Sequence, residues 1–194
     1  MDQKIKLLLS SFGDHRIKLD EQLKFHTLSQ LPATTQAFFV ATNRNELLES
    51  ISAAYDLKIP TIILGSGTKI NFTSAKFEGL VIKNRSDNLK IGAVRGKVGR
   101  GGIGVEEAMV EADSGVSLSR LNEFLVKQNL QPINFNSNPL ATLGGALWSD
   151  FSLQFYIETI TIWHKGEVEE INLKQLDKLN QVILSVILKI KSKN

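Results

Sequence analysis

The spacing of apolar and polar positions predicts a β-α-β unit in the first half of the chain. The apolar runs 37–42 (AFFVAT) and 61–65 (TIILG) are typical of strands buried on both faces of a sheet. Between them, apolar residues at helical spacing predict a helix over 44–57, with Asn43 placed to cap its first turn. Strands joined by a helix of this length run parallel through a right-handed crossover. The run 79–84 (GLVIKN) predicts a third strand.

The pattern changes after residue 86 and predicts a mostly antiparallel second half. Two strands should flank a glycine-rich tip at 99–104, and Ser117 is placed to cap a helix over 118–128. Period-two alternation over 157–173 predicts a hairpin. The apolar run 181–190 predicts a last strand.

These elements together predict an α+β fold with two lobes. A helical segment over 1–24 ends in a polar turn and precedes both lobes. We expect a small β-α-β lobe over 25–85 and a larger lobe over 86–194, made of mostly antiparallel sheet with helices. With 194 residues, of which 42% are hydrophobic, the chain is long enough to bury a sizeable core.

Composition and charge exclude several classes of function. The chain has no cysteine, which excludes disulfides, thiolate metal sites and a cysteine nucleophile, and we expect no metal site. The net charge of +3 is spread along the chain without a basic stripe, so we expect no nucleic-acid partner. No apolar run approaches the length of a membrane span, and the first residues do not resemble a secretory signal. We therefore expect a cytoplasmic protein that does not bind membranes.

The chain leaves the second predicted strand in a short glycine-rich stretch. Gly65 and Gly67 permit positive φ angles and close approach of the backbone. At the carboxyl end of a parallel strand, such a stretch suits an anion held by peptide N–H groups and hydroxyls. An ordinary tight turn is the alternative. The candidate binding residues are Leu64, Gly65, Ser66, Gly67, Thr68, Lys69 and Ile70.

A second glycine-rich stretch lies in the predicted larger lobe. Short polar side chains precede Pro139, and the pair Gly144-Gly145 lets the backbone pass close to a bulky group. A polar connection into a helix is the alternative. Because each lobe has one such loop, we expect a ligand held between the lobes. The candidate binding residues are Asn136, Ser137, Asn138, Pro139, Thr142, Leu143, Gly144, Gly145 and Ala146.

The motif GRGGIG at 99–104 matches the dinucleotide fingerprint G-x-G-x-x-G only by its letters. That fingerprint needs a strand before it and a helix opening within it, whereas strands are predicted on both sides here. We therefore expect a hairpin tip and no nucleotide at this position. The three histidines are scattered and adjacent glutamates in a strand face opposite ways, so no catalytic residue is assigned.

The two loops, in this order and spacing, resemble those of a known family. Residues 59–84 (IPTIILGSGTKINFTSAKFEGLVIKN) are similar to the flavin-binding signature of the UDP-N-acetylenolpyruvoylglucosamine reductases, in which a strand runs into L-G-x-G-S-N. Residues 110–147 are similar to the next segment of that family, which ends in G-I-P-G-x-V-G-G-A. The resemblance covers about residues 22–190.

The resemblance implies a two-lobed FAD-binding domain of the PCMH type, with FAD in the cleft between the lobes. Residues 65–69 would cradle the diphosphate, and residues 136–146 would line the isoalloxazine and ribityl groups. It further implies a flavin-dependent oxidoreductase, with NADPH as a candidate electron donor and a small molecule or a protein as redox partner. The resemblance leaves the oligomeric state open.

The chain also departs from this family. Thr68-Lys69 replace the family's Ser-Asn, and residues 136–139 replace its G-I-P-G. The family's catalytic Arg is not found, since no arginine follows Arg120, and its proton-donating Ser and late Glu are not found either. We expect the family's C-terminal substrate domain to be absent.

Three functions therefore remain open. The first is a flavin-dependent oxidoreductase module of unknown substrate. The second is a reduced but active NADPH-dependent UDP-N-acetylenolpyruvoylglucosamine reductase of peptidoglycan synthesis. The third is a flavin-free binding or scaffold protein on the same fold.

Overall fold

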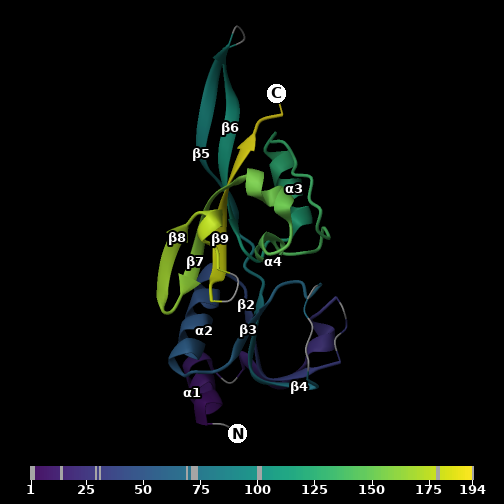
Figure 1. The fold of residues 1–194 in the computed structure, drawn as a ribbon, viewed down its shortest axis with the longest axis vertical. Helices are drawn as coiled ribbons and strands as arrows, with labels where there is room; N and C mark the ends of the chain where they lie inside the picture. Colours follow the sequence, from purple (N-terminus) through teal and green to yellow (C-terminus); the bar gives the residue numbers. More distant parts are fainter. Residues whose placement is uncertain are drawn as a thin grey trace. The chain divides into compact units, whose positions relative to one another are not determined.

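The computed structural model describes residues 3–13, 15–28, 30, 32–68, 70, 74–99, 102–177 and 180–193. Contacts divide the chain into two units, Met1–Ser86 and Asp87–Asn194. Each unit has its own sheet, and Figure 1 shows the strands and helices of both. The α+β fold class predicted from the sequence is confirmed.

The first unit contains a four-stranded sheet in the order β1-β2-β4-β3. Strands β2 and β3 both run parallel to β4, and β1 runs antiparallel to β2. The predicted parallel β-α-β unit is confirmed, although the third predicted strand lies between the other two. The elements of this unit are α1 (Gln3–Phe12), β1 (Ile17–Gln22), η1 (Leu23–Phe25), β2 (Thr34–Ala41), α2 (Arg44–Asp56), β3 (Thr61–Leu64) and β4 (Lys76–Asn84).

Strand β1 corrects the expectation of a helix and a polar turn over residues 1–24. The helix ends at Phe12, and β1 pairs with β2 from Ile17 opposite Phe39 to Gln22 opposite Thr34. Only Ile17 of this strand is buried. An edge strand with one buried residue has no apolar run, and therefore its sequence gives no strand signal.

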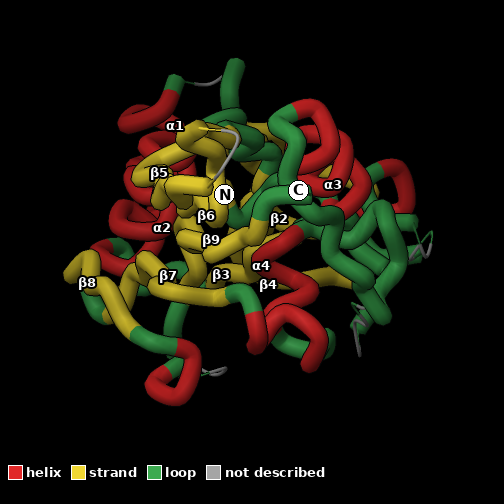
Figure 2. The backbone as a smooth tube through the Cα atoms, turned by 90° about the horizontal axis from the view of Figure 1, so that it is seen from above, coloured by secondary structure: helices red, strands yellow, loops and turns green. Residues whose placement is uncertain are grey.

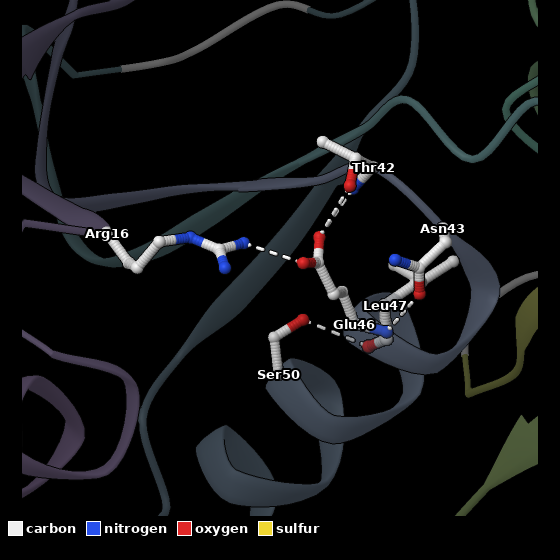
Figure 3. Close-up of polar contacts among 6 residues, drawn as sticks. All are labelled: Arg16, Thr42, Asn43, Glu46, Leu47 and Ser50. Carbon is white, nitrogen blue, oxygen red and sulfur yellow. Dashed lines mark hydrogen bonds and ion pairs between the residues drawn. The ribbon is translucent and has the colours of Figure 1, made fainter.

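Polar contacts at the end of β2 fix the start of α2 (Figure 3). The side chain of Asn43 accepts a hydrogen bond of 2.9 Å from the Glu46 N–H, as the predicted helix cap requires. The Glu46 carboxylate in turn accepts bonds from the Thr42 N–H (2.8 Å) and hydroxyl (2.9 Å). Its other oxygen lies 2.9 Å from the Arg16 guanidinium. These bonds connect the turn after α1, the end of β2 and the start of α2.

The two faces of the first sheet carry different layers. Helix α2 covers one face with its buried residues, which include Leu47 and Ile51. A separate core cluster lies on the other face and consists of Leu23, Ala33, Phe38, Leu64 and Val81. Alternate strand residues share a face, so Lys83 lies on the same face as Val81. This second face carries the segment around η1.

The second unit contains a five-stranded antiparallel sheet in the order β5-β6-β9-β7-β8. Figure 2 shows helices α3 and α4 among the elements of this unit. Their apolar residues form one core with residues of β6, β7 and β9. The predicted antiparallel half is confirmed. Its elements are β5 (Leu89–Gly99), β6 (Gly102–Asp113), α3 (Leu118–Lys127), α4 (Leu143–Leu147), η2 (Phe151–Phe155), β7 (Ile157–His164), β8 (Glu167–Ile171), η3 (Leu173–Gln175) and β9 (Val182–Lys191).

The glycine-rich motif at 99–104 is the tip of a hairpin, as predicted. Strands β5 and β6 pair as far as Gly99 opposite Gly102. Residues 100 and 101 lie outside the described residues. The hairpin extends beyond the rest of its sheet, since β6 pairs with β9 only from Glu107 onward (Figure 1). None of the motif's described residues is helical and strands lie on both sides of it, so it lacks the context of a dinucleotide fingerprint.

Among the helices of the described residues, none combines the length and the apolar composition that crossing a membrane requires.

Candidate functional site

The first candidate loop leaves the carboxyl end of β3. Leu64 is the last residue of this strand, and its side chain is buried in the cluster under the sheet. Ile70 packs partly against the same cluster. Gly65, Ser66, Gly67 and Thr68 form the turn between them, and Lys69 lies outside the described residues. Two apolar anchors therefore hold a polar, glycine-rich loop at the sheet edge where ligands of parallel sheets bind.

Gly67 is the conformationally demanding position of this loop. Its φ angle is +72°, a region that residues with a Cβ rarely adopt. A Cβ at this position would lie 2.8 Å from the Cα and Cβ of Thr27. The peptide before Gly67 is also held, because the Leu28 N–H donates to the Ser66 carbonyl at 3.3 Å. The loop therefore rests directly on the segment that follows η1.

Lys83 supports the same loop from below. It pairs with Leu64 across the β3–β4 ladder, and it is only 8% exposed. Its ammonium donates hydrogen bonds to the Gly65 carbonyl (2.6 Å) and to the His26 carbonyl (2.7 Å). Burial, and then repulsion by Arg85, lower the pKa of Lys83 to about 8. Sequence reasoning missed this residue, although a lysine inside the apolar run GLVIKN was a signal.

The groups of this loop suit an anion. The hydroxyls of Ser66 and Thr68 make no hydrogen bond to another residue that the structure describes, and both residues are only partly buried. The buried ammonium of Lys83 adds a positive charge behind the Gly65 carbonyl. Hydroxyl donors, peptide N–H groups and a nearby cation are the combination that binds phosphate oxygens in proteins.

The second candidate loop is fastened to a buried carboxylate, Asp150, which follows α4 and is 4% exposed. It accepts hydrogen bonds from the Ser137 N–H (2.7 Å), the Ser152 N–H (3.0 Å) and the Ser152 hydroxyl (2.5 Å). The Asn136 side chain lies 3.5 Å from the same carboxylate. Burial alone would raise the pKa of Asp150, but the bonds from Ser152 and Ser137 outweigh it and lower the pKa. Asp150 therefore fixes the start of the loop.

The second half of this loop is built into the core of its unit. Thr142 caps α4 by accepting a bond of 3.3 Å from the Gly145 N–H. The Gly144 N–H donates to the Ser114 carbonyl at 2.8 Å, and a Cβ on Gly144 would lie 3.0 Å from the Cβ of Ser114. The side chains of Leu143 and Ala146 are 0% and 1% exposed.

The predicted residues of the second loop therefore divide into two groups. The side chains of Thr142, Leu143 and Ala146 pack inward and position the loop. The exposed residues, which offer surface to a ligand, are Asn136, Asn138, Pro139 and Gly145. Local sequence patterns alone could not separate these groups, because the short helix α4 and its packing on β9 determine which residues face inward.

A pocket of about 190 Å³ lies beside α4 in the same unit. Its apolar walls come from Leu147, Trp148, Leu153, Ile157, Leu173 and Leu176. The pocket was not predictable from the sequence, because its residues lie in two stretches of the chain, 147–157 and 173–176, that only the fold brings together. Within the described ranges, no group of three or more His, Asp or Glu is placed to hold a metal ion.

Comparison with protein families matches residues 35–152 to the FAD binding domain family. This range contains both candidate loops.

Two curated reductases are similar to this chain in sequence. The UDP-N-acetylenolpyruvoylglucosamine reductase of Clostridium tetani is 24% identical over 201 residues, covering 96% of this chain and 61% of that protein. The protein of the same name from Caldanaerobacter subterraneus is 28% identical over 132 residues, covering 68% of this chain and 39% of that protein. The chain therefore spans about three fifths or less of the length of these relatives.

Solved structures share the fold. The UDP-N-acetylenolpyruvylglucosamine reductase of Thermus caldophilus aligns with a TM-score of 0.63 at 15% identity, covering 92% of this chain and 62% of that one. An alkyldihydroxyacetonephosphate synthase aligns with a TM-score of 0.68 at 15% identity, covering 98% of this chain and 40% of that one.

Proposed function

The chain belongs to the FAD-binding domain family, and from this premise we propose that it is the flavin-binding module of an oxidoreductase. FAD supplies the redox chemistry when it is bound, and the protein supplies binding and orientation. The residues of the two candidate loops are proposed to divide this work between the diphosphate and the flavin ring system.

The loop after β3 is proposed to bind the diphosphate of FAD. The observation that carries this proposal is the arrangement of backbone, hydroxyl groups and a buried cation around residues 65–68, at the end of a parallel strand. The left-handed Gly67 lets the backbone turn tightly, the two hydroxyls have no described partner, and the Lys83 ammonium lies beneath Gly65. A doubly charged diphosphate matches these donors. Leu64 and Ile70 hold the loop to the core, and Lys69 is proposed as a further contact.

The loop before α4 is proposed to contact the flavin and ribityl groups. Its exposed residues, which include Asn138, Pro139 and Gly145, offer amide donors and an unobstructed backbone. Ser137 is held by Asp150, and the buried residues of the loop keep α4 in place. Gly145 leaves room for a flat ring because it presents no side chain.

A second candidate function is an NADPH-dependent UDP-N-acetylenolpyruvoylglucosamine reductase of peptidoglycan synthesis. The similarity of the chain to reductases of that name favours it. In that case we expect NADPH as the electron donor. For the flavin-binding module of the main proposal, no electron donor or acceptor is assigned.

Titration with FAD tests the main proposal. We expect saturable binding, followed by flavin fluorescence, and a rise in melting temperature with FAD concentration because the ligand binds only the folded state. A protein that shows neither response to FAD would instead be a flavin-free member of the fold.

An activity assay separates the two oxidoreductase functions. NADPH oxidation that depends on the enolpyruvyl UDP-sugar would establish the reductase. FAD binding without such turnover would leave the flavin module as the function of this chain.

A further inference from the structure

We propose that Lys83 is the positioning residue of the diphosphate loop, which it holds and polarises from beneath without touching the cofactor. This inference rests on the proposed function, since it assigns a role in FAD binding. It concerns a residue that neither candidate loop contains.

The first argument is the cost of burying Lys83. Its ammonium is bonded to two backbone carbonyls, those of Gly65 and His26. Among the residues that the structure describes, no carboxylate forms an ion pair with it. A buried ammonium without a countercharge is unfavourable, and the nearby Arg85 adds repulsion. A bound anion at the adjacent loop would supply the countercharge that the described residues do not.

The second argument is the direction of the peptide groups. The Gly65 carbonyl and the Ser66 N–H belong to one peptide, and in a trans peptide these two groups point in opposite directions. Because Lys83 binds the carbonyl from inside, the Ser66 N–H is directed away from the core. The next carbonyl, that of Ser66, is held by the Leu28 N–H. The carbonyls of two successive peptides are therefore both held by hydrogen bonds.

The third argument is polarisation. A hydrogen bond from a charged donor to a peptide carbonyl strengthens the N–H of the same peptide as a donor. The chain of groups from the Lys83 ammonium through the Gly65–Ser66 peptide therefore delivers positive potential to the loop surface. This potential increases the affinity for a ligand in proportion to the ligand's negative charge. It should therefore strengthen binding of the diphosphate and leave binding of an uncharged flavin unchanged.

The test compares ligands with and without a diphosphate. Lys83→Met removes the ammonium and keeps the length of the side chain. We expect it to weaken binding of FAD and of ADP by about tenfold or more, the effect of losing a hydrogen bond to a charged group. Binding of riboflavin, which lacks phosphate, should change less than twofold.

Lys76→Met is the matched control. It removes the same charge from the opposite end of the same strand, where Lys76 is exposed and lies 3.0 Å from Asp20. We expect it to leave all three affinities unchanged. If Lys83→Met does not fold, Lys83→Gln retains an N–H donor for the carbonyls without the charge, and the same loss for ADP is expected.

Two results would overturn the inference. One is unchanged FAD and ADP binding by folded Lys83 variants, and the other is equal weakening for riboflavin, which a purely structural role would give. Failure of the wild-type protein to bind FAD is a different result, because it contradicts the proposed function itself.

Discussion

At the residue scale, some of the groups on which the first candidate loop depends were predictable from the sequence, and others were not. The need for glycine at position 67 was predictable, and the structure gives the reason: a φ of +72° and the contact with Thr27. The role of Lys83 was not predictable, because it follows from the pairing of β3 with β4 and from burial. Leu143 and Ala146 were predicted as binding residues, yet their side chains lie in the core.

Gly67→Ala should destabilise the protein by at least about 1–2 kcal/mol, because the left-handed conformation is unfavourable for a residue with a Cβ. The Cβ would also approach Thr27 to 2.8 Å and displace the loop, so FAD binding should fall as well. Chemical denaturation measures the first effect and FAD titration the second.

Gly104→Ala is the control for this substitution. A Cβ at Gly104 meets nothing within 4 Å, and the residue belongs to strand β6 and to neither candidate loop. Equal losses in the two variants would contradict the reading of residues 65–68 as the ligand loop.

The lowered pKa of Lys83 predicts a dependence of stability on pH. The pKa is about 8 in the folded protein and 10.5 in its ordinary state, so the unfolded chain holds the proton more tightly between these values. Burying the ammonium is therefore unfavourable below pH 8, and this penalty is relieved as the pH rises. The FAD-free wild type should gain about 1–3 kcal/mol relative to Lys83→Met between pH 8 and pH 10.

Lys83 has other charged groups nearby. Arg85 follows the last residue of β4 and repels the ammonium, and His26, whose carbonyl Lys83 contacts, pairs through its ring with Glu21 at 2.7 Å. If the free energies of unfolding of the wild type and of Lys83→Met change with pH in parallel, the ammonium of Lys83 is not buried without a carboxylate partner as described.

At the element scale, strands and helices with continuous apolar patterns were predictable, and those at the edges were not. The strands β2, β3, β4 and β9 carry apolar runs, and the caps of α2 and α3 follow from Asn43 and Ser117. Strand β1 was missed because its residues after Ile17 are largely exposed. The position of β4 between β2 and β3 was also missed, since pairing order does not follow from local patterns.

The start of α2 supplies a prediction at this scale. Burial would raise the pKa of Glu46, but bonds from Thr42 and Arg16 lower it below its usual value of 4.5. The carboxylate therefore stabilises the fold above its unfolded pKa, and this contribution is lost as the pH falls through the folded pKa. Glu46→Gln should cost about 1 kcal/mol at neutral pH, and the difference from wild type should shrink in acid.

Glu49→Gln, at an exposed position of the same helix, is the control and should change stability little at any pH. Thermal unfolding from pH 7 down to pH 3 measures both variants. A Glu46 effect that does not depend on pH would contradict the network shown in Figure 3.

At the scale of the whole molecule, the division into a mixed parallel unit and an antiparallel unit was predictable from the change of pattern near residue 86. Each unit holds one candidate loop, and each loop is fixed by its own buried charge, Lys83 in the first and Asp150 in the second. The reaction was not predictable, because the described residues of the two loops do not bring a catalytic set of side chains together. The central claim is therefore that this chain binds FAD.

The most direct test of that claim is a titration of the purified chain with FAD, followed by flavin fluorescence and by the visible spectrum after removal of free cofactor. We expect saturable binding at one FAD per chain and a flavin spectrum that stays with the protein. Fluorescence that remains that of free FAD at every protein concentration, with a colourless protein after removal of the cofactor, would contradict it.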